Sequence, residues 1–503
     1  MHASENNAES KHLGSSSGFK ANEGIFSKYA TGDGPRGQPL QQARENFSSS
    51  QAPKKIAVSL SHSKRVTSLD DQLITAMALM VVTFSLLPAG LEWISYDDFM
   101  AQAQGTSWRF QLQWLGIFAI ALLVALRNGG ETWALVKAAN PFLILMLLYT
   151  TTSILWSVDP SISFKRVFQF AGLLLTATVL QISIKPIDNF FNALLTGVSG
   201  ILLASTIVAL VYPSLGHDSG FGTAWRGILN TKNDLGFLGA MGVILWVVKA
   251  DSRSWPIAVS LIGGGISALC IVQATSSTGI ATALIGVTVF LVLRKRYIDS
   301  PLWLTRLLAT ASIFAIAGVH WFFIQEGRLP RWGEVIGPFA ALFGKGTDLT
   351  GRTEIWEYVF IEFQKHPILG VGWGAFWLGP GSASQPVLDQ LPWIPFQAHN
   401  GYLDILNELG SAGMLIFICM LLVHAHQLYR MLKIDQSQAA CHISFAVIVL
   451  FSNFSESTLY KTVAFHHMLL IFSSLWASSS IYKSKDKIER ASMLQAKTRT
   501  IAG

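Results

Sequence analysis

Long apolar runs separated by short polar connections make up most of the chain after about residue 70. Runs of about 17–23 residues are long enough to cross the ~30 Å hydrocarbon core of a bilayer as helices. Lipid requires that every backbone group be hydrogen-bonded internally, and helices achieve this in runs of this length. The pattern predicts an all-α, polytopic integral membrane protein with about twelve transmembrane helices. They are expected at residues 72–94, 110–126, 136–156, 164–184, 190–212, 233–249, 256–274, 278–294, 302–324, 402–428, 440–458 and 462–482.

The polar segments divide the chain into five predicted regions. Residues 1–68 are rich in Ser, Gly, Asn and Gln without an apolar period, which predicts a disordered tail and no secretory signal peptide. Helices one to nine are expected within residues 69–324, and helices ten to twelve within residues 402–482. Residues 325–401 between them form a large outer loop, and residues 483–503 form a second tail.

The composition excludes several classes of protein. Hydrophobic residues make up 51% of the chain and charged residues only 13%, about half the usual share for soluble domains. Soluble enzymes, disordered proteins and nucleic-acid-binding modules are therefore excluded. The net charge of +7 comes from Lys and Arg clustered in alternate connections and in both tails, so we expect both termini in the cytoplasm. Cys270, Cys419 and Cys441 show no metal-ligand spacing, so neither a disulfide framework nor a zinc site is expected. No cofactor is expected.

Two segments on the predicted outer face carry Lys and Arg residues, which connections on that face usually lack. One is the loop 213–232, with Arg226 and Lys232, and the other is the long loop, whose cations include Arg328, Arg331 and Arg352. Long loops are translocated largely regardless of charge, so the predicted topology holds. Cations retained on this face indicate an anionic substrate.

Residues 353–365 of the long loop predict an amphipathic helix at the membrane surface. Ile355, Val359 and Phe363 share one face, opposite acidic and polar side chains. Arg352 precedes the first turn, where an anion would meet both the guanidinium group and the unpaired N–H groups of the helix start. The alternative, equally weighted here, is that Arg352 pairs with Glu354 or with a lipid phosphate.

His399 and Asn400 stand at the outer mouth of the predicted tenth helix. A lone histidine is usually structural, but this one shares its loop with Arg352 and is a candidate proton-transfer or positioning group. Glu408 follows on the same helix, roughly 13 Å deeper, and Glu456 lies near the outer end of the eleventh. A carboxylate at either place needs a partner, so each is expected to organise a cavity or to pair with another helix.

Several short motifs are spread over most of the predicted membrane portion. The glycines of Gly370–Gly374 lack the strand–helix unit of a dinucleotide site, so they predict a close backbone approach instead. The other elements are Trp156-Ser157-Val158-Asp159-Pro160 with Lys165-Arg166, Trp225-Arg226-Gly227-Ile228 with Asn230 and Lys232-Asn233-Asp234-Leu235-Gly236, Gly351-Arg352 with Ile355-Trp356, the turn Pro367–Gly372, and His399-Asn400 with Tyr402-Leu403, Leu406, Glu408 and Gly410. In this order the set resembles the O-antigen ligase / polysaccharide polymerase superfamily, and within it the ExoQ-type exopolysaccharide polymerases.

The resemblance implies a glycan carried on undecaprenyl diphosphate and transferred on the periplasmic face of a bacterial inner membrane, without a metal. The implied catalytic residues are Arg226, Arg352 and His399. The turn Ser276–Gly279 lacks the arginine that some members have, so that phosphate contact is either missing or supplied by Lys232. The implied substrate-binding residues are Lys232, Asn233, Arg328, Arg331, Asn400 and Glu408. Membrane lipids, a chain-length regulator and export proteins are the further partners expected, and no nucleic acid.

The expected reaction is a single displacement at the anomeric carbon, which inverts it and polymerises exopolysaccharide repeat units. One alternative is an O-antigen ligase, which transfers the glycan to the lipid A core. Another is a metal-dependent glycosyltransferase that uses Asp97 and Asp98, for which chelation of divalent ions would be diagnostic. A different class is a flippase for lipid-linked oligosaccharides, although transporters usually show midplane charges or paired broken helices.

Overall fold

A computed structural model describes residues 68–87, 107–183, 185–218, 222–294, 322, 334, 352–392, 394–459, 461 and 463–502, all within one compact unit. In these ranges the chain is helical, with a single isolated bridge between His217 and Trp225. The prediction of an all-α protein is therefore confirmed there. The predicted ninth helix, most of the first tail, and Asp97, Asp98, Arg328 and Arg331 lie outside the described residues.

The described elements follow the predicted apolar runs closely. In chain order they are α2 (Ser68–Leu86), α4 (Trp108–Arg127), α5 (Gly129–Ala138), α6 (Pro141–Thr152), η2 (Ser153–Leu155), α7 (Pro160–Leu180), α8 (Pro186–Val211), α9 (Pro213–Gly216), α10 (Lys232–Ser252), α11 (Ile257–Gln273), α12 (Ser277–Arg294), α15 (Arg352–Phe363), α16 (Gln385–Leu388), α17 (Gly401–Met431), α18 (Gln436–Ser452) and α19 (Phe465–Ala502).

Seven of the described helices are long and apolar enough to cross a membrane, or eight if the bent pair of α5 and α6 is one span. α11 and α18 are shorter apolar helices. The protein is thus polytopic, while the number twelve and the boundaries of the long loop stay predictions. α15 coincides with the amphipathic helix expected in that loop, and α19 continues without a break into the predicted second tail.

The predicted span 136–156 is bent by 96° between α5 and α6. Asn140 lies at the bend, fully buried, and its side-chain oxygen accepts a hydrogen bond from the Phe142 N–H at the start of α6. Pro141 at the first position of α6 lacks an N–H and suits a helix start. The Asn140 amide also donates to the Met420 carbonyl of α17 at 2.9 Å, which ties the bend to the bundle.

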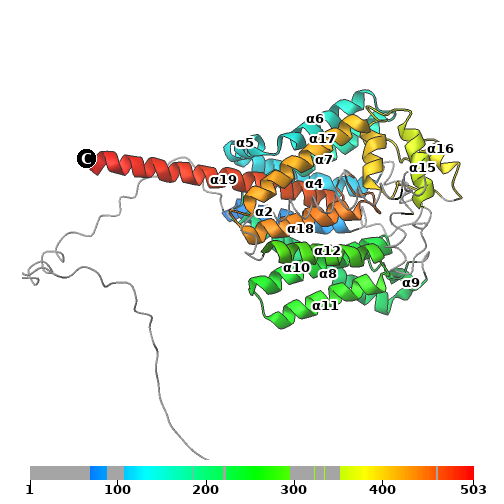
Figure 1. Ribbon diagram of the computed structural model, residues 1–503, viewed down its shortest axis with the longest axis horizontal. Helices are drawn as coiled ribbons and strands as arrows, with labels where there is room; N and C mark the ends of the chain where they lie inside the picture. Colours follow the sequence, from blue (N-terminus) through cyan, green and yellow to red (C-terminus); the bar gives the residue numbers. More distant parts are fainter. Residues whose placement is uncertain are drawn as a thin grey trace, which may run out of the picture. The chain divides into compact units, whose positions relative to one another are not determined.

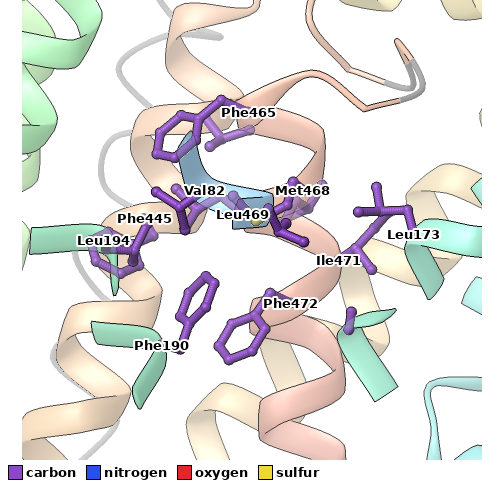
Figure 2. Packing of buried hydrophobic residues seen from close by; sticks show 14 of the residues in the cluster. Val82, Leu173, Phe190, Leu194, Phe445, Phe465, Met468, Leu469, Ile471 and Phe472 are labelled. Atoms are coloured by element: carbon purple, nitrogen blue, oxygen red, sulfur yellow. The ribbon is translucent and has the colours of Figure 1, made fainter. Parts of the chain in front are cut away.

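The helices pack around a continuous apolar core. α10 packs on α11 and α12, and α12 packs on α18 (Figure 1). Figure 2 shows how Val82 of α2, Leu173 of α7, Phe190 of α8, Phe445 of α18 and Phe472 of α19 meet in one cluster. Because lipid tails are as apolar as these side chains, close van der Waals packing stabilises the contacts more than exclusion of water does.

Polar side chains join α17, α18 and α19 inside this core. The Ser473 hydroxyl lies 3.0 Å from Nδ1 of His442 and 3.2 Å from Nε2 of His424. All three residues are buried. Interhelical hydrogen bonds of this kind hold helices together in lipid. The serines and histidines of α19 also explain why this helix is less apolar than the seven candidate spans.

α17 is interrupted at Gly410, whose φ of 67° and ψ of −173° are not helical. The N–H groups that the break releases find other acceptors: Ser411 donates to the Pro367 carbonyl at 2.9 Å and Ala412 to the Ile368 carbonyl at 3.1 Å. A Cβ atom on Gly410 would collide with the Ile368 carbonyl. Only glycine fits this break, because it alone tolerates both the positive φ and the contact.

The glycine-rich turn satisfies the carbonyl groups on the other side of the break. Val371 N–H donates to the Asn407 carbonyl at 2.9 Å, and Gly372 N–H donates to the Glu408 carbonyl at 3.0 Å. A Cβ atom on Gly370, whose φ is +69°, would collide with the Glu408 backbone. The close backbone approach predicted for these glycines is therefore confirmed. A broken helix at membrane depth is tolerated where other groups satisfy its backbone in this way.

Candidate functional site

Four distant segments of the chain meet at the carboxylate of Glu456, which follows α18. Asn233 Nδ2 donates to Oε1 at 2.9 Å, and Arg352 Nη2 donates to the same oxygen at 3.2 Å. Nδ1 of His399 lies 3.6 Å from Oε2. We call these four residues the Glu456 cluster. The side chains of Arg352, His399 and Glu456 are only 16%, 25% and 19% exposed, so their charges are partly desolvated.

Hydrogen bonds to backbone groups hold Glu456 in place. Asn453, at the C-terminal end of α18, accepts from the N–H groups of Thr458 and Leu459 at 2.8 and 2.9 Å, which closes the turn. The Gly401 N–H, at the start of α17, donates to the carbonyl groups of both Asn453 and Glu456 at 3.0 Å. The carboxylate is therefore fixed relative to the two helices that flank it.

His399 sits in a strained turn directly before α17. Its φ is 50°, in the left-handed region that β-carbons disfavour. Asn400 caps the helix by accepting from the N–H groups of Tyr402 and Leu403, and its own N–H donates to the Ser457 hydroxyl at 2.9 Å. Asn400 thus acts on the backbone, and it orients His399 toward Glu456.

A second neighbour contacts Nδ1 of the His399 ring. Nε2 of Gln397 lies 3.1 Å from Nδ1 of His399, and the Lys461 ammonium group donates to Oε1 of Gln397 at 3.1 Å. The lysine fixes the orientation of the amide, because an ammonium group can only donate. The amide N–H group then points at Nδ1, which also lies 3.6 Å from Oε2 of Glu456, so this ring nitrogen has both a donor and an acceptor beside it.

Lys232 adds a second cation beside Arg352. Its backbone N–H donates to Oδ2 of Asp218 at 3.2 Å, and its ammonium group lies within electrostatic range of both Asp218 and Arg352. Two neighbouring cations of this kind can bind anionic phosphate groups. Each cation is already balanced by a carboxylate, Arg352 by Glu456 and Lys232 by Asp218, so an incoming anion competes with these carboxylates.

Arg226 lies in the same loop as Lys232 but is used differently. Its backbone N–H donates to the Gly216 carbonyl at 2.9 Å, and its Nε donates to the Leu215 carbonyl at 3.1 Å. Gly227, with φ of 62°, packs where a Cβ atom would collide with Ser205 of α8. Within the described ranges no contact joins Arg226 to the Glu456 cluster, so its catalytic role stays a prediction.

Glu408 also lies apart from the Glu456 cluster. Its Oε2 accepts from the Gly374 N–H at 2.9 Å, and the charge of Arg166 in α7 lies nearby. The interaction with Arg166 agrees with the expected pairing with another helix, whereas the bond to the glycine-rich turn was not predicted. Contact with substrate stays a prediction for Glu408, as it does for Arg328 and Arg331, whose positions are outside the described residues.

Sequence reasoning missed three residues that support the site: Asp218, Gln397 and Lys461. It singled out Glu456 only as a carboxylate in need of a partner. The usable signal was the polar stretch Ser455-Glu456-Ser457 that closes an apolar run. The partners themselves are 104 and 223 residues away along the chain, for Arg352 and Asn233 respectively, so spacing does not reveal them.

Two comparisons show which known proteins this chain is similar to. A family model described as O-antigen ligase matches residues 262–418, which include Arg352, His399, Asn400 and Glu408. The exopolysaccharide production protein ExoQ of Rhizobium meliloti (strain 1021) is 26% identical over 312 residues, covering 59% of this chain and 68% of ExoQ. The resemblance predicted from the motifs is confirmed: the chain is similar to the O-antigen ligase family over residues 262–418 and to ExoQ.

Proposed function

We propose that the protein transfers a glycan from undecaprenyl diphosphate to a sugar hydroxyl, with inversion, and so polymerises exopolysaccharide repeat units. The family match and the ExoQ relative support a membrane polysaccharide polymerase or ligase in general. The observation that carries the finer proposal is the Glu456 cluster. It gathers Arg352, His399 and Asn233 from three remote segments beside Lys232, although each of them was a separate candidate in the sequence.

The cations act on the leaving group. As the bond from the anomeric carbon to the diphosphate breaks, negative charge grows on the diphosphate oxygens. Arg352 and Lys232 stabilise this charge, and their partly buried setting strengthens the interaction. The planar guanidinium group of Arg352 donates two parallel hydrogen bonds to a phosphate. Glu456 occupies Arg352 until the donor displaces it, so the arginine is held in place between turnovers.

His399 positions a substrate oxygen through Nε2. In this proposal the amide of Gln397 donates to Nδ1, so the ring proton lies on Nε2 and Nε2 donates to the substrate oxygen. The attacking hydroxyl forms the new bond to the anomeric carbon and loses its proton to an oxygen of the departing diphosphate. The products are a longer glycan and the protonated lipid diphosphate. The departing diphosphate thus accepts the proton, and the reaction needs no metal.

The setting follows the predicted topology. We place both tails, residues 1–68 and 483–503, in the cytoplasm and the segment 325–401 in the periplasm of a bacterial inner membrane. The donor is the undecaprenyl-diphosphate-linked oligosaccharide, and a chain-length regulator and export proteins are the further partners. Arg226, Arg328 and Arg331 are additional phosphate contacts in this proposal, and Asn400 and Glu408 shape the site around them.

A second candidate is the ligase reaction, with the lipid A core as acceptor. The description of the matching family as O-antigen ligase favours it. Both reactions use the same donor and the same displacement, so they differ only in the acceptor. The size and the attachment of the products distinguish them.

The test is genetic complementation with product analysis. A strain that lacks the gene receives wild type, Arg352→Ala, His399→Ala or, as a matched cation control, Lys365→Ala, whose side chain is 53% exposed and paired with Glu362. Lipid-linked and secreted glycans are resolved by size at equal membrane levels of protein. We expect long chains from wild type and Lys365→Ala, and single lipid-linked units from the other two. Long lipid-linked chains that fail to reach lipid A indicate the ligase, and long chains from every variant contradict the site.

A further inference from the structure

A cavity of about 430 Å³ lies between the start of α7 and the loop that precedes α16, and the mechanism above does not use it. This volume is within the range of small-molecule sites, roughly 300–1,000 Å³, and accommodates one or two sugar rings. Its lining residues are Val158, Asp159, Ile162, Ala375, Leu378, Pro380, Gly381, Ser382 and Ala383.

The lining suits a neutral sugar. Val158, Ile162 and Leu378 supply apolar surface for the C–H faces of a ring. Asp159 caps α7 with Oδ1, which accepts from the Ile162 N–H at 3.0 Å, and a carboxylate has a second oxygen that can accept from sugar hydroxyls. The same negative charge disfavours a phosphate or an acidic sugar. The cavity therefore has the opposite preference to the cation pair of Lys232 and Arg352.

Hydrogen bonds connect the cavity wall to His399. Leu378 follows Trp377, whose indole N–H donates to Oδ1 of Asp404 at 2.8 Å. The same oxygen accepts from the backbone N–H of Ala398, next to His399, at 3.2 Å. Asp404 is only 4% exposed, so both bonds lie inside the protein and are strong. One carboxylate thus holds the wall of the cavity and the segment that carries His399.

A small apolar core joins Arg352 to the same unit. α15 begins at Arg352 and buries Ile355 and Val359 against the segments that form the cavity wall and precede His399. The members of this cluster are Ile355, Val359, Val371, Phe376, Trp377, Val387, Leu391 and Ala398. The cavity, Arg352 and His399 therefore belong to one packed unit, in which their relative positions are defined.

We infer that the cavity binds the acceptor, as one or two neutral sugar residues next to the hydroxyl that attacks. The inference rests on the proposed function and adds the place of the second substrate. The donor binds through its diphosphate at Lys232 and Arg352, whereas the acceptor binds through hydroxyls and ring faces between α7 and residues 375–383. The two sites thus bind different parts of a lipid-linked glycan, the diphosphate of the donor and the outer sugars of the acceptor.

The test separates acceptor from donor kinetics in the purified full-length protein in lipid nanodiscs. The donor is the lipid-linked oligosaccharide from a strain that lacks the gene, and the acceptor is the same oligosaccharide freed from its lipid. Ala383→Trp fills the cavity, and Asp159→Asn removes the charge while its oxygen still caps α7. Gln390→Trp, on an exposed residue outside the lining, is the matched control. Thermal unfolding verifies that each variant is folded.

We expect the KM for the free oligosaccharide to rise about 10-fold or more in Ala383→Trp and Asp159→Asn, as for loss of a hydrogen bond to a charged group. With the free oligosaccharide at saturating concentration, the KM for the lipid-linked donor stays at the wild-type value, and Gln390→Trp behaves as wild type. If the KM for the acceptor is unchanged in both cavity variants and Arg352→Ala is inactive, the cavity is not the acceptor site and the proposed function remains intact. If Arg352→Ala is fully active, the proposed function fails instead. Equilibrium binding of labelled oligosaccharide to wild type and Ala383→Trp then tests, independently of catalysis, whether the cavity binds the acceptor.

Discussion

Glu456 is the residue on which the candidate site depends, because it is the common partner of a guanidinium group, an amide and an imidazole. A partly buried carboxylate of this kind keeps Arg352 oriented while no anion is bound. It also competes with the substrate for the arginine. Glu456 therefore favours catalysis by orienting Arg352 and weakens substrate binding by competing for the same arginine. Substitution of Glu456 separates these two effects.

Glu456→Gln keeps the shape of the side chain and removes its charge. We expect undecaprenyl diphosphate to inhibit this variant at roughly 3- to 10-fold lower concentration than wild type, because Arg352 no longer pairs with an internal anion. Turnover falls because Arg352 and His399 lose their common partner. The inhibition constant of the product with purified protein measures the effect, and Lys365→Ala is the control. An inhibition constant that rises or stays constant contradicts the competition between Glu456 and substrate.

His399 offers a second test at the level of one side chain. If Nε2 donates to a substrate oxygen, a glutamine amide can replace it, whereas a proton acceptor has no such substitute. We expect His399→Gln to retain activity within about 10-fold of wild type, while His399→Ala loses roughly 10²–10³ in kcat, as for removal of an oxyanion-hole donor. Steady-state kinetics on both variants provide the comparison. Equal loss in the two would show that His399 accepts a proton.

At the level of elements, the break in α17 and the glycine-rich turn form one structure. Each provides the hydrogen-bond partners that the other lacks, and Glu408 reinforces the join through the Gly374 N–H. The part of α17 that precedes the break begins directly after His399 and Asn400. The geometry of the site therefore depends on the position at which this helix is interrupted.

Gly410→Ala tests this dependence. We expect it to destabilise the protein by about 1–3 kcal/mol, because the added Cβ meets the Ile368 carbonyl and the positive φ becomes unfavourable. Gly265→Ala, in the middle of α11 with open space around its Cβ position, is the matched control and should be neutral or slightly stabilising. Thermal unfolding in detergent measures both. Equal midpoints for the two variants would show that the break tolerates a side chain.

At the level of the whole molecule, the orientation in the membrane decides whether the site meets its substrate. The proposed function requires the Glu456 cluster and α15 on the periplasmic face and both tails in the cytoplasm. The distribution of Lys and Arg along the sequence favours this arrangement.

Cysteine accessibility tests the orientation. Replacement of Cys270, Cys419 and Cys441 removes the native thiols, of which Cys419 is only partly buried. In that background, a cysteine at Lys365 should react with a membrane-impermeant maleimide added to spheroplasts, and one at Lys487 should react only after lysis. Labelling of Lys487→Cys in intact spheroplasts would place the second tail outside and reverse the proposed topology.

The sequence alone determined the class of the protein and most of its helices, because bilayer thickness imposes a length and an apolar composition that are visible in single segments. It also singled out Arg352, His399 and the glycines of residues 370–374 as individual residues. It did not predict the bend at Asn140 or the position of the break at Gly410, since hydropathy continues through both. Only the tertiary structure brought Arg352, Asn233 and His399 to Glu456, and the cavity to the same packed unit. These contacts join segments far apart along the chain, and local patterns carry no information about which partly buried charge will meet which partner.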